Sequence, residues 1–154
     1  MTSAPLLRLT SPAFADDGPI PARYSCDGAN VSPPLAWGGA PRETRAFAVL
    51  VSDPDARGFV HWVAVDIPGT SAGLPEGASG SGRAGREGRN DFGRPGWGGP
   101  CPPSGTHRYV FVLYALAAPL DLAGAPSAAE VRGKLAGRTL AQARLTGTYR
   151  RSAG

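Results

Sequence analysis

Apolar runs of strand length alternate with segments rich in glycine and proline along most of this chain. Two runs, at 46–52 and 60–67, are separated by seven residues rich in turn formers, which predicts a hairpin with a long loop. The run at 108–117 is apolar on both faces and predicts a central strand. Apolar and polar residues alternate over 141–150, and this period of two predicts another strand.

The remaining elements complete a mainly β chain. A short strand is expected at 6–9 and irregular structure over 14–41, where Asp-Gly and Pro-Pro steps are frequent. One helix is expected at 127–137, because Ser127 and Glu130 form a capping-box pattern and Gly137 is a natural stop. The 154 residues favour a single domain, 1–154, with a flexible Gly-rich loop at 69–97.

Charge and targeting signals narrow the class of protein. The chain carries a net charge of +4, but its arginines are dispersed and no recognition helix is evident, which argues against a nucleic-acid partner. The first residues lack the pattern of a signal peptide, and no apolar stretch is long enough to span a membrane. These features predict a cytoplasmic protein, in which Cys26 and Cys101 would be thiols by default.

Both histidines lie where strands are expected to begin. In the predicted hairpin, Asp53 and Asp55 come close to His61, which would share one strand face with Val63, Val65 and Ile67. His107 stands at the mouth of the central strand, on the face of Tyr109, Phe111 and Leu113. Two histidines in the same setting predict one polar pocket at an end of a sheet. Nearby glycines would expose backbone N–H groups, which suit an anion.

Plainer interpretations stay open for the same residues. A histidine at a strand end is usually a hydrogen-bonded structural residue, and Asp-Pro-Asp is often only a turn. An Asp–His pair could also activate Ser104, and two histidines with an aspartate could hold a metal. However, the sequence has no HExxH, GxSxG or CxxC motif, and nothing in it indicates a cofactor. The residues alone leave a small-anion binding module and a hydrolase as the candidates.

Five motifs make the chain resemble the phosphatidylethanolamine-binding protein family, also called Raf kinase inhibitor proteins, and more narrowly its bacterial branch. The motifs span nearly the whole chain: IPARYSCDGANVSPPLAW, DPDARGFVHWVAVDIP, NDFGRPGWGGP, GPCPPSGTHRYVFVLYAL and LTGTYR. The resemblance implies a sandwich of two antiparallel sheets with a few short peripheral helices. It also implies a pocket for phosphate, phosphorylethanolamine or similar phosphorylated or carboxylated groups. Carried over residue by residue, the ligand-binding set is Asp53, Asp55, His61, Pro102, Pro103, His107 and Tyr109.

The resemblance further implies a binding or inhibitory protein that is not an enzyme, with a kinase or protease as a potential protein partner and a homodimer as a potential state. A hydrolase using the His pair is kept as the weaker alternative. Arg57 departs from the family pattern, which usually has proline at this position, and it is expected to pair with Asp55 or to meet an anion. Cys26 and Cys101 both lie in family-like motifs, so the sequence allows either a disulfide or two thiols.

Overall fold

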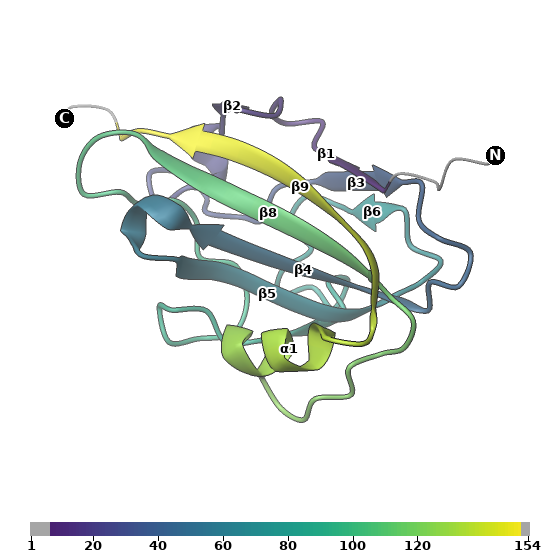
Figure 1. Ribbon diagram of the computed structural model, residues 1–154. Coiled ribbons are helices and arrows are strands. Elements are labelled where there is room, and N and C mark those ends of the chain that lie inside the picture. Colours follow the sequence, from purple (N-terminus) through teal and green to yellow (C-terminus); the bar gives the residue numbers. More distant parts are fainter. Residues whose placement is uncertain (1–6, 152–154) are drawn as a thin grey trace.

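Two β-sheets and one helix make up the computed structural model, which describes residues 7–151 (Figure 1). The larger sheet has six strands in the order β2-β9-β8-β4-β5-β7, and the smaller has three in the order β1-β3-β6. Neighbouring strands are antiparallel except β2 and β9, which are parallel. The strands are β1 Arg8–Thr10, β2 Gly18–Pro19, β3 Leu35–Gly38, β4 Ala46–Asp53, β5 Phe59–Pro68, β6 Gly73–Leu74, β7 Arg86–Glu87, β8 His107–Leu116 and β9 Thr139–Tyr149. The helices are α1 Ala128–Leu135 and the 3-10 turns η1 Ala22–Tyr24 and η2 Pro54–Ala56.

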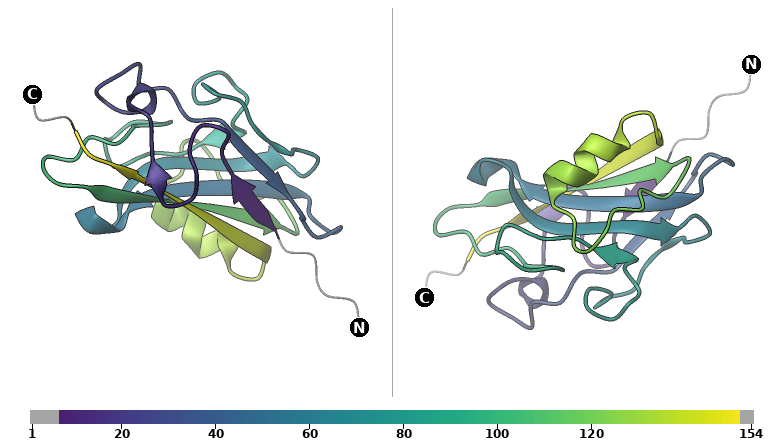
Figure 2. Two further views of the ribbon diagram at one scale, coloured as in Figure 1. Left: turned by 90° about the horizontal axis from the view of Figure 1, so that it is seen from above. Right: turned by 90° about the horizontal axis from the view of Figure 1, so that it is seen from below.

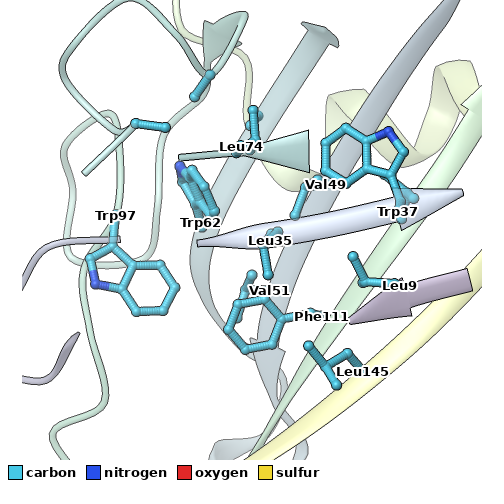
Figure 3. Close-up of a cluster of buried hydrophobic side chains, with 14 of the residues drawn as sticks. Leu9, Leu35, Trp37, Val49, Val51, Trp62, Leu74, Trp97, Phe111 and Leu145 are labelled. Carbon is cyan, nitrogen blue, oxygen red and sulfur yellow. The ribbon is translucent and has the colours of Figure 1, made fainter. Parts of the chain in front are cut away.

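The main hydrophobic core lies between the two sheets. Residues of the smaller sheet, such as Leu35 and Trp37, face residues of the larger sheet such as Val49 and Phe111 (Figure 3). Trp62 and Phe111 have no exposed surface at all. A buried aromatic side chain of this kind contributes several kcal/mol of hydrophobic free energy, so this core fixes how the two sheets sit against each other.

Helix α1 covers the other face of the larger sheet (Figure 2). Its apolar residues Val131 and Leu135 pack with Val63 and Val65 of β5 in a second buried cluster. The predicted capping box is present, since the Ser127 hydroxyl accepts from the Glu130 N–H and the Glu130 carboxylate accepts from the Ser127 N–H. The helix prediction is therefore confirmed.

The long predicted strands are confirmed, and the short strand predicted at 6–9 overlaps β1, but the other short strands were missed. β4, β5, β8 and β9 match the four apolar or alternating runs, and β8 lies inside the sheet as expected. The stretch 14–41 was expected to be irregular but contains β2, η1 and β3. The Gly-rich stretch 69–97 contains β6 and β7, and the side chains of Leu74 and Trp97 within it are buried. Strands of two to four residues are too short to show a period. The flexibility of 69–97 stays a prediction, and position 6 of the predicted strand 6–9 lies outside the described residues.

Two β-bulges in β5 change which side chains share a face. Opposite Val51 and Ser52 of β4, β5 has one extra residue, His61, and a second shift separates Ala64 from Ile67. Val63 and Val65 consequently face the helix, whereas Ile67 joins Trp62 in the core between the sheets. The predicted shared face of His61, Val63, Val65 and Ile67 is thus wrong, because strict alternation does not survive an inserted residue.

Candidate functional site

A cavity of about 210 Å³ opens at the end of the larger sheet where β4 ends and β8 begins. In Figure 1 this is the end at which η2 joins β4 to β5. The lining residues come from β4, η2, β5, the loop around Phe92, the segment before β8, and β8 itself: Asp53, Ala56, Phe59, His61, Phe92, Cys101, Pro102, Pro103, His107 and Tyr109. Six of the seven residues predicted from the sequence therefore lie together around one cavity, and Asp55 does not line it.

Asp53 and His107 are joined by a hydrogen bond at the cavity wall. The Asp53 side chain is 3% exposed, and its Oδ2 lies 2.6 Å from His107 Nδ1. Its other oxygen accepts the Asp55 backbone N–H at 2.8 Å. Because a carboxylate oxygen accepts, Nδ1 carries the hydrogen and Nε2 is left for another partner. No residue of the described chain bonds to Nε2, so this atom is available to a ligand.

His61 is oriented by the opposite wall of the cavity. Its Nδ1 lies 2.6 Å from the Gly98 carbonyl oxygen and therefore donates to it. Burial lowers the pKa of His61, and the carbonyl and Asp53 only partly offset this effect. The neutral ring has its hydrogen on Nδ1, which makes Nε2 an acceptor. The bulge at His61 aims the ring toward Tyr109, with ring centroids 5.1 Å apart.

Tyr109 supplies a hydroxyl that stays protonated. The residue is 1% exposed, and burial, followed by the charge of Asp53, raises its pKa. Its hydroxyl has no hydrogen-bond partner among residues 7–151. In this part of the chain, Thr44 Oγ1 is the only fully buried side-chain oxygen or nitrogen without a partner, so the Tyr109 hydroxyl is not fully buried. The Tyr109 hydroxyl is therefore reachable from the cavity and can donate a hydrogen bond there.

Asp55 has a different position from the one predicted. Its carboxylate accepts three hydrogen bonds from Arg108, through the backbone N–H at 2.8 Å and the guanidinium at 2.9 and 3.1 Å. These bonds lower the pKa of Asp55 to about 2. Asp55 thus ties η2 to the start of β8, next to His107. Arg57 does not pair with Asp55, because Arg108 occupies that carboxylate.

The backbone at Arg57 does not fit the proline that usually stands at this position in the family. Arg57 has φ +58°, in the left-handed region, whereas proline is fixed near −65°. We expect Arg57→Pro to lower the free energy of unfolding by about 2 kcal/mol through this conflict. Arg57→Gly is the matched control and should raise stability by about 0.5 kcal/mol, because glycine adopts this conformation freely. Urea denaturation measures both values, and equal stability of the two variants would contradict the explanation.

Four lining residues were not predicted: Ala56, Phe59, Phe92 and Cys101. The two phenylalanines pack edge to face with centroids 4.8 Å apart, and both approach the His61 ring. Phe92 lies in the 69–97 segment, where no sequence period was available to place it. Cys101 forms a disulfide with Cys26, which the sequence had left open. The cavity thus has an aromatic wall beside its polar groups.

Neither a metal centre nor a membrane helix is found in residues 7–151. They contain no cluster of three or more His, Cys, Asp or Glu side chains that could hold a metal ion. No helix among them is long and apolar enough to cross a membrane.

Comparison with known proteins decides the family. The family model described as phosphatidylethanolamine-binding protein matches residues 10–150. The chain belongs to the phosphatidylethanolamine-binding protein family. A UPF0098 protein of Methanothermobacter thermautotrophicus is 47% identical over 150 residues, covering 94% of this chain and 99% of the relative. The crystal structure of Escherichia coli YbcL, described as a new member of the mammalian PEBP family, has a TM-score of 0.87 and 34% identity, covering 95% and 99%.

These comparisons confirm both the family resemblance and the mainly β sandwich inferred from the motifs. None of the relatives described here has the name of an enzyme. One is a Mycobacterium tuberculosis protein whose name includes the words "lipoprotein LppC"; it is 42% identical over 147 residues, which cover 93% of this chain and 72% of that protein. Membership of the phosphatidylethanolamine-binding protein family therefore gives this chain the fold of a binding protein.

The buried His61 should make the protein less stable in mild acid. Because burial lowers its pKa, the unfolded chain takes up a proton near pH 6.5 while the folded protein does not. Stability from this group is complete above pH 6.5 and decreases as pH falls toward the folded pKa. We expect His61→Asn to flatten the loss of stability below pH 6.5 in urea denaturation. An NMR titration of the wild type in which His61 titrates above pH 6.5 would contradict this expectation.

Proposed function

We propose that this chain is a non-enzymatic binding protein whose cavity takes a small phosphorylated or carboxylated group, such as phosphate or phosphorylethanolamine. One observation carries the proposal. His61 Nε2, His107 Nε2 and the Tyr109 hydroxyl have no partner within residues 7–151, and all three side chains line one small cavity. Few converging polar groups in a largely apolar cavity are typical of small-molecule sites.

The charges of the cavity favour a ligand that is not purely anionic. Asp53 is buried and opposes a second negative charge unless His107 is protonated and pairs with it. Tyr109 donates a hydrogen bond regardless of pH near neutrality, because its pKa is raised. The aromatic wall of Phe59 and Phe92 suits an ammonium group. A zwitterion such as phosphorylethanolamine can place its phosphate near the donors and its ammonium near Asp53 and these rings.

The direct test is calorimetry with phosphorylethanolamine and inorganic phosphate. Tyr109→Phe removes only the hydroxyl, and we expect about tenfold weaker binding, since a hydrogen bond to a charged group contributes about 1.5–3 kcal/mol. Tyr114→Phe is the matched control, because Tyr114 packs on the helix side of the sheet and should leave affinity unchanged. If the wild type binds neither probe at millimolar concentration, the proposed function is wrong.

The charge of His61 should contribute little to ligand binding between pH 8 and 6. Since burial lowers the pKa of His61, its charge contributes little in that range. We therefore expect the pH dependence of phosphorylethanolamine affinity between pH 8 and 6, measured by calorimetry, to be the same in the wild type and in His61→Asn. A pH dependence that is weaker in His61→Asn would contradict this expectation.

A protein partner is the second candidate, and Phe92 favours it. Phe92 is 46% exposed at the edge of the cavity, where an apolar side chain can dock a partner such as a kinase or protease. Competition between phosphorylethanolamine and such a partner would support this function. The hydrolase alternative is weaker, because the described lining offers no serine, threonine or free thiol as nucleophile. Turnover of a phosphoester that His107→Ala abolishes would revive it.

A cytoplasmic location stays a prediction and must accommodate the disulfide. Disulfides persist in oxidising compartments, whereas those in the cytoplasm are usually transient. In the cytoplasm this disulfide would therefore form and break. Cys101 lines the cavity, so that change would take place at the proposed ligand site.

A further inference from the structure

One wall of the cavity is a short segment with few attachments. Residues 101–106 lead into β8, and three of them, Cys101, Pro102 and Pro103, line the cavity. No hydrogen bond joins this segment to any other residue in the described part of the chain. Pro102 is buried, while the other five residues are exposed. The wall is therefore held mainly from its two ends.

The C-terminal end of this segment is fixed by the larger sheet. His107 is the first residue of β8 and lies opposite Tyr149 of β9. Arg108 is tied to Asp55 by three hydrogen bonds. These contacts also hold the His107 ring against Asp53, so this end stays in place whatever happens to the rest of the wall.

The N-terminal end of the segment is fixed by the Cys26–Cys101 disulfide. Just before it, the Pro100 carbonyl accepts the Cys26 N–H at 3.1 Å, and the Gly99 N–H donates to Asn30 at 2.9 Å. The disulfide is the last link before the unattached residues. Without it, freedom would extend from Cys101 to β8, and the proline wall would be held only by the hydrogen bond at Pro100 and by the start of β8.

Cys26 is itself a firm anchor. Its neighbours Ser25 and Asp27 both bond to the Tyr149 hydroxyl, at 2.9 and 2.5 Å. Arg151 completes the cluster with a hydrogen bond to Asp27 at 3.1 Å. Because Tyr149 lies opposite His107, the disulfide fastens the proline wall to the same strand pair that carries the histidine.

Both cysteines are exposed, so a thiol in solution can reach the bond. Two molecules of a thiol such as glutathione supply two electrons and two protons. The Cys26–Cys101 bond breaks to give two cysteine thiols, and one glutathione disulfide forms. Reduction needs no other co-reactant.

We propose that the Cys26–Cys101 disulfide is a redox switch that sets the affinity of the cavity by fixing or releasing its Pro102–Pro103 wall. The proposal rests on the proposed binding function. In the oxidised protein the wall is already in place when ligand arrives. In the reduced protein, binding must first order the released segment, and this loss of chain entropy weakens affinity. We expect at least a tenfold increase in Kd on reduction.

The test is calorimetry with phosphorylethanolamine on oxidised and glutathione-reduced wild type, with circular dichroism on both. The matched control is C26S/C101S, which should bind as weakly as the reduced wild type, with or without glutathione. NMR relaxation should show that Cys101–Thr106 becomes mobile on reduction while β8 does not. Because coupling is reciprocal, saturating ligand should also shift the thiol–disulfide equilibrium toward the oxidised form by the same factor.

The outcomes separate this proposal from the function on which it rests. If the oxidised protein binds neither phosphorylethanolamine nor phosphate, the binding function itself fails. If the oxidised protein binds and reduction leaves Kd unchanged, the binding function stands and the redox switch is wrong. A reduced chain that has lost its β-sheet spectrum would also overturn the switch, because the bond would then serve folding rather than the wall.

Discussion

Gly99→Ala should lower the free energy of unfolding by about 3 kcal/mol, because a methyl group at this position has no room. Gly99 is buried, and a Cβ there would lie 2.1 Å from the Tyr24 carbonyl oxygen and 2.3 Å from Asn30 Oδ1. The first of these atoms belongs to the backbone and cannot rotate away. Relief requires the 24–30 loop and the Gly99 segment to separate, which also breaks the hydrogen bond from Gly99 to Asn30.

Gly133→Ala is the control for this substitution. Gly133 lies within α1, and a Cβ there meets no atom within 4 Å. Alanine is favoured over glycine in a helix by about 1 kcal/mol, so the control should become more stable by that amount. Urea denaturation at pH 7 gives both values. If Gly99→Ala proved as stable as the wild type, the close packing of the two loops would be disproved.

The second large effect concerns the disulfide. C26S/C101S should lose about 4 kcal/mol of stability relative to the oxidised wild type, since the bond joins residues 75 positions apart and restricts the unfolded chain. Domains typically have 5–15 kcal/mol of stability, so we expect the variant still to fold. This expectation is what allows the redox switch to be tested on a folded reduced protein.

Denaturation with and without reductant provides the control. Reductant should bring the wild type down to the stability of C26S/C101S and should leave the variant unchanged. A difference below about 1 kcal/mol between the oxidised wild type and the variant would mean that the unfolded chain is already restricted near these cysteines. In that case the bond would have little part in stability.

The fold was predictable wherever a strand is long enough to show its period. β8 and β9 stand out by ten or more residues of apolar or alternating pattern, and α1 by its capping box. β6 and β7 have two residues each and depend on pairing with strands distant in the sequence, which no local pattern reveals. The bulges of β5 were equally hidden, because one inserted residue leaves composition and hydropathy unchanged.

The site was predictable where strand geometry determines it. His107 and Tyr109 follow from alternation along β8, and Asp53 from its place at the end of β4. Phe92 and Cys101 could not be assigned, because their positions depend on loops that are fixed by tertiary contacts alone. Asp55 was predicted to line the site because it belongs to the same motif as Asp53. Its side chain instead bonds to Arg108 and does not line the cavity.

The strand order has a consequence for how the cavity forms during synthesis. β4 and β5 are neighbours in sequence and in the sheet, so their hairpin can form early, whereas β8 must later add to the other side of β4. Pairing between segments so far apart in the chain is slow relative to local pairing. Until the ribosome adds Pro102, the nascent chain contains Asp53 and His61 but has neither the proline wall nor His107. We therefore expect the cavity to be complete only late in folding, after the hairpin.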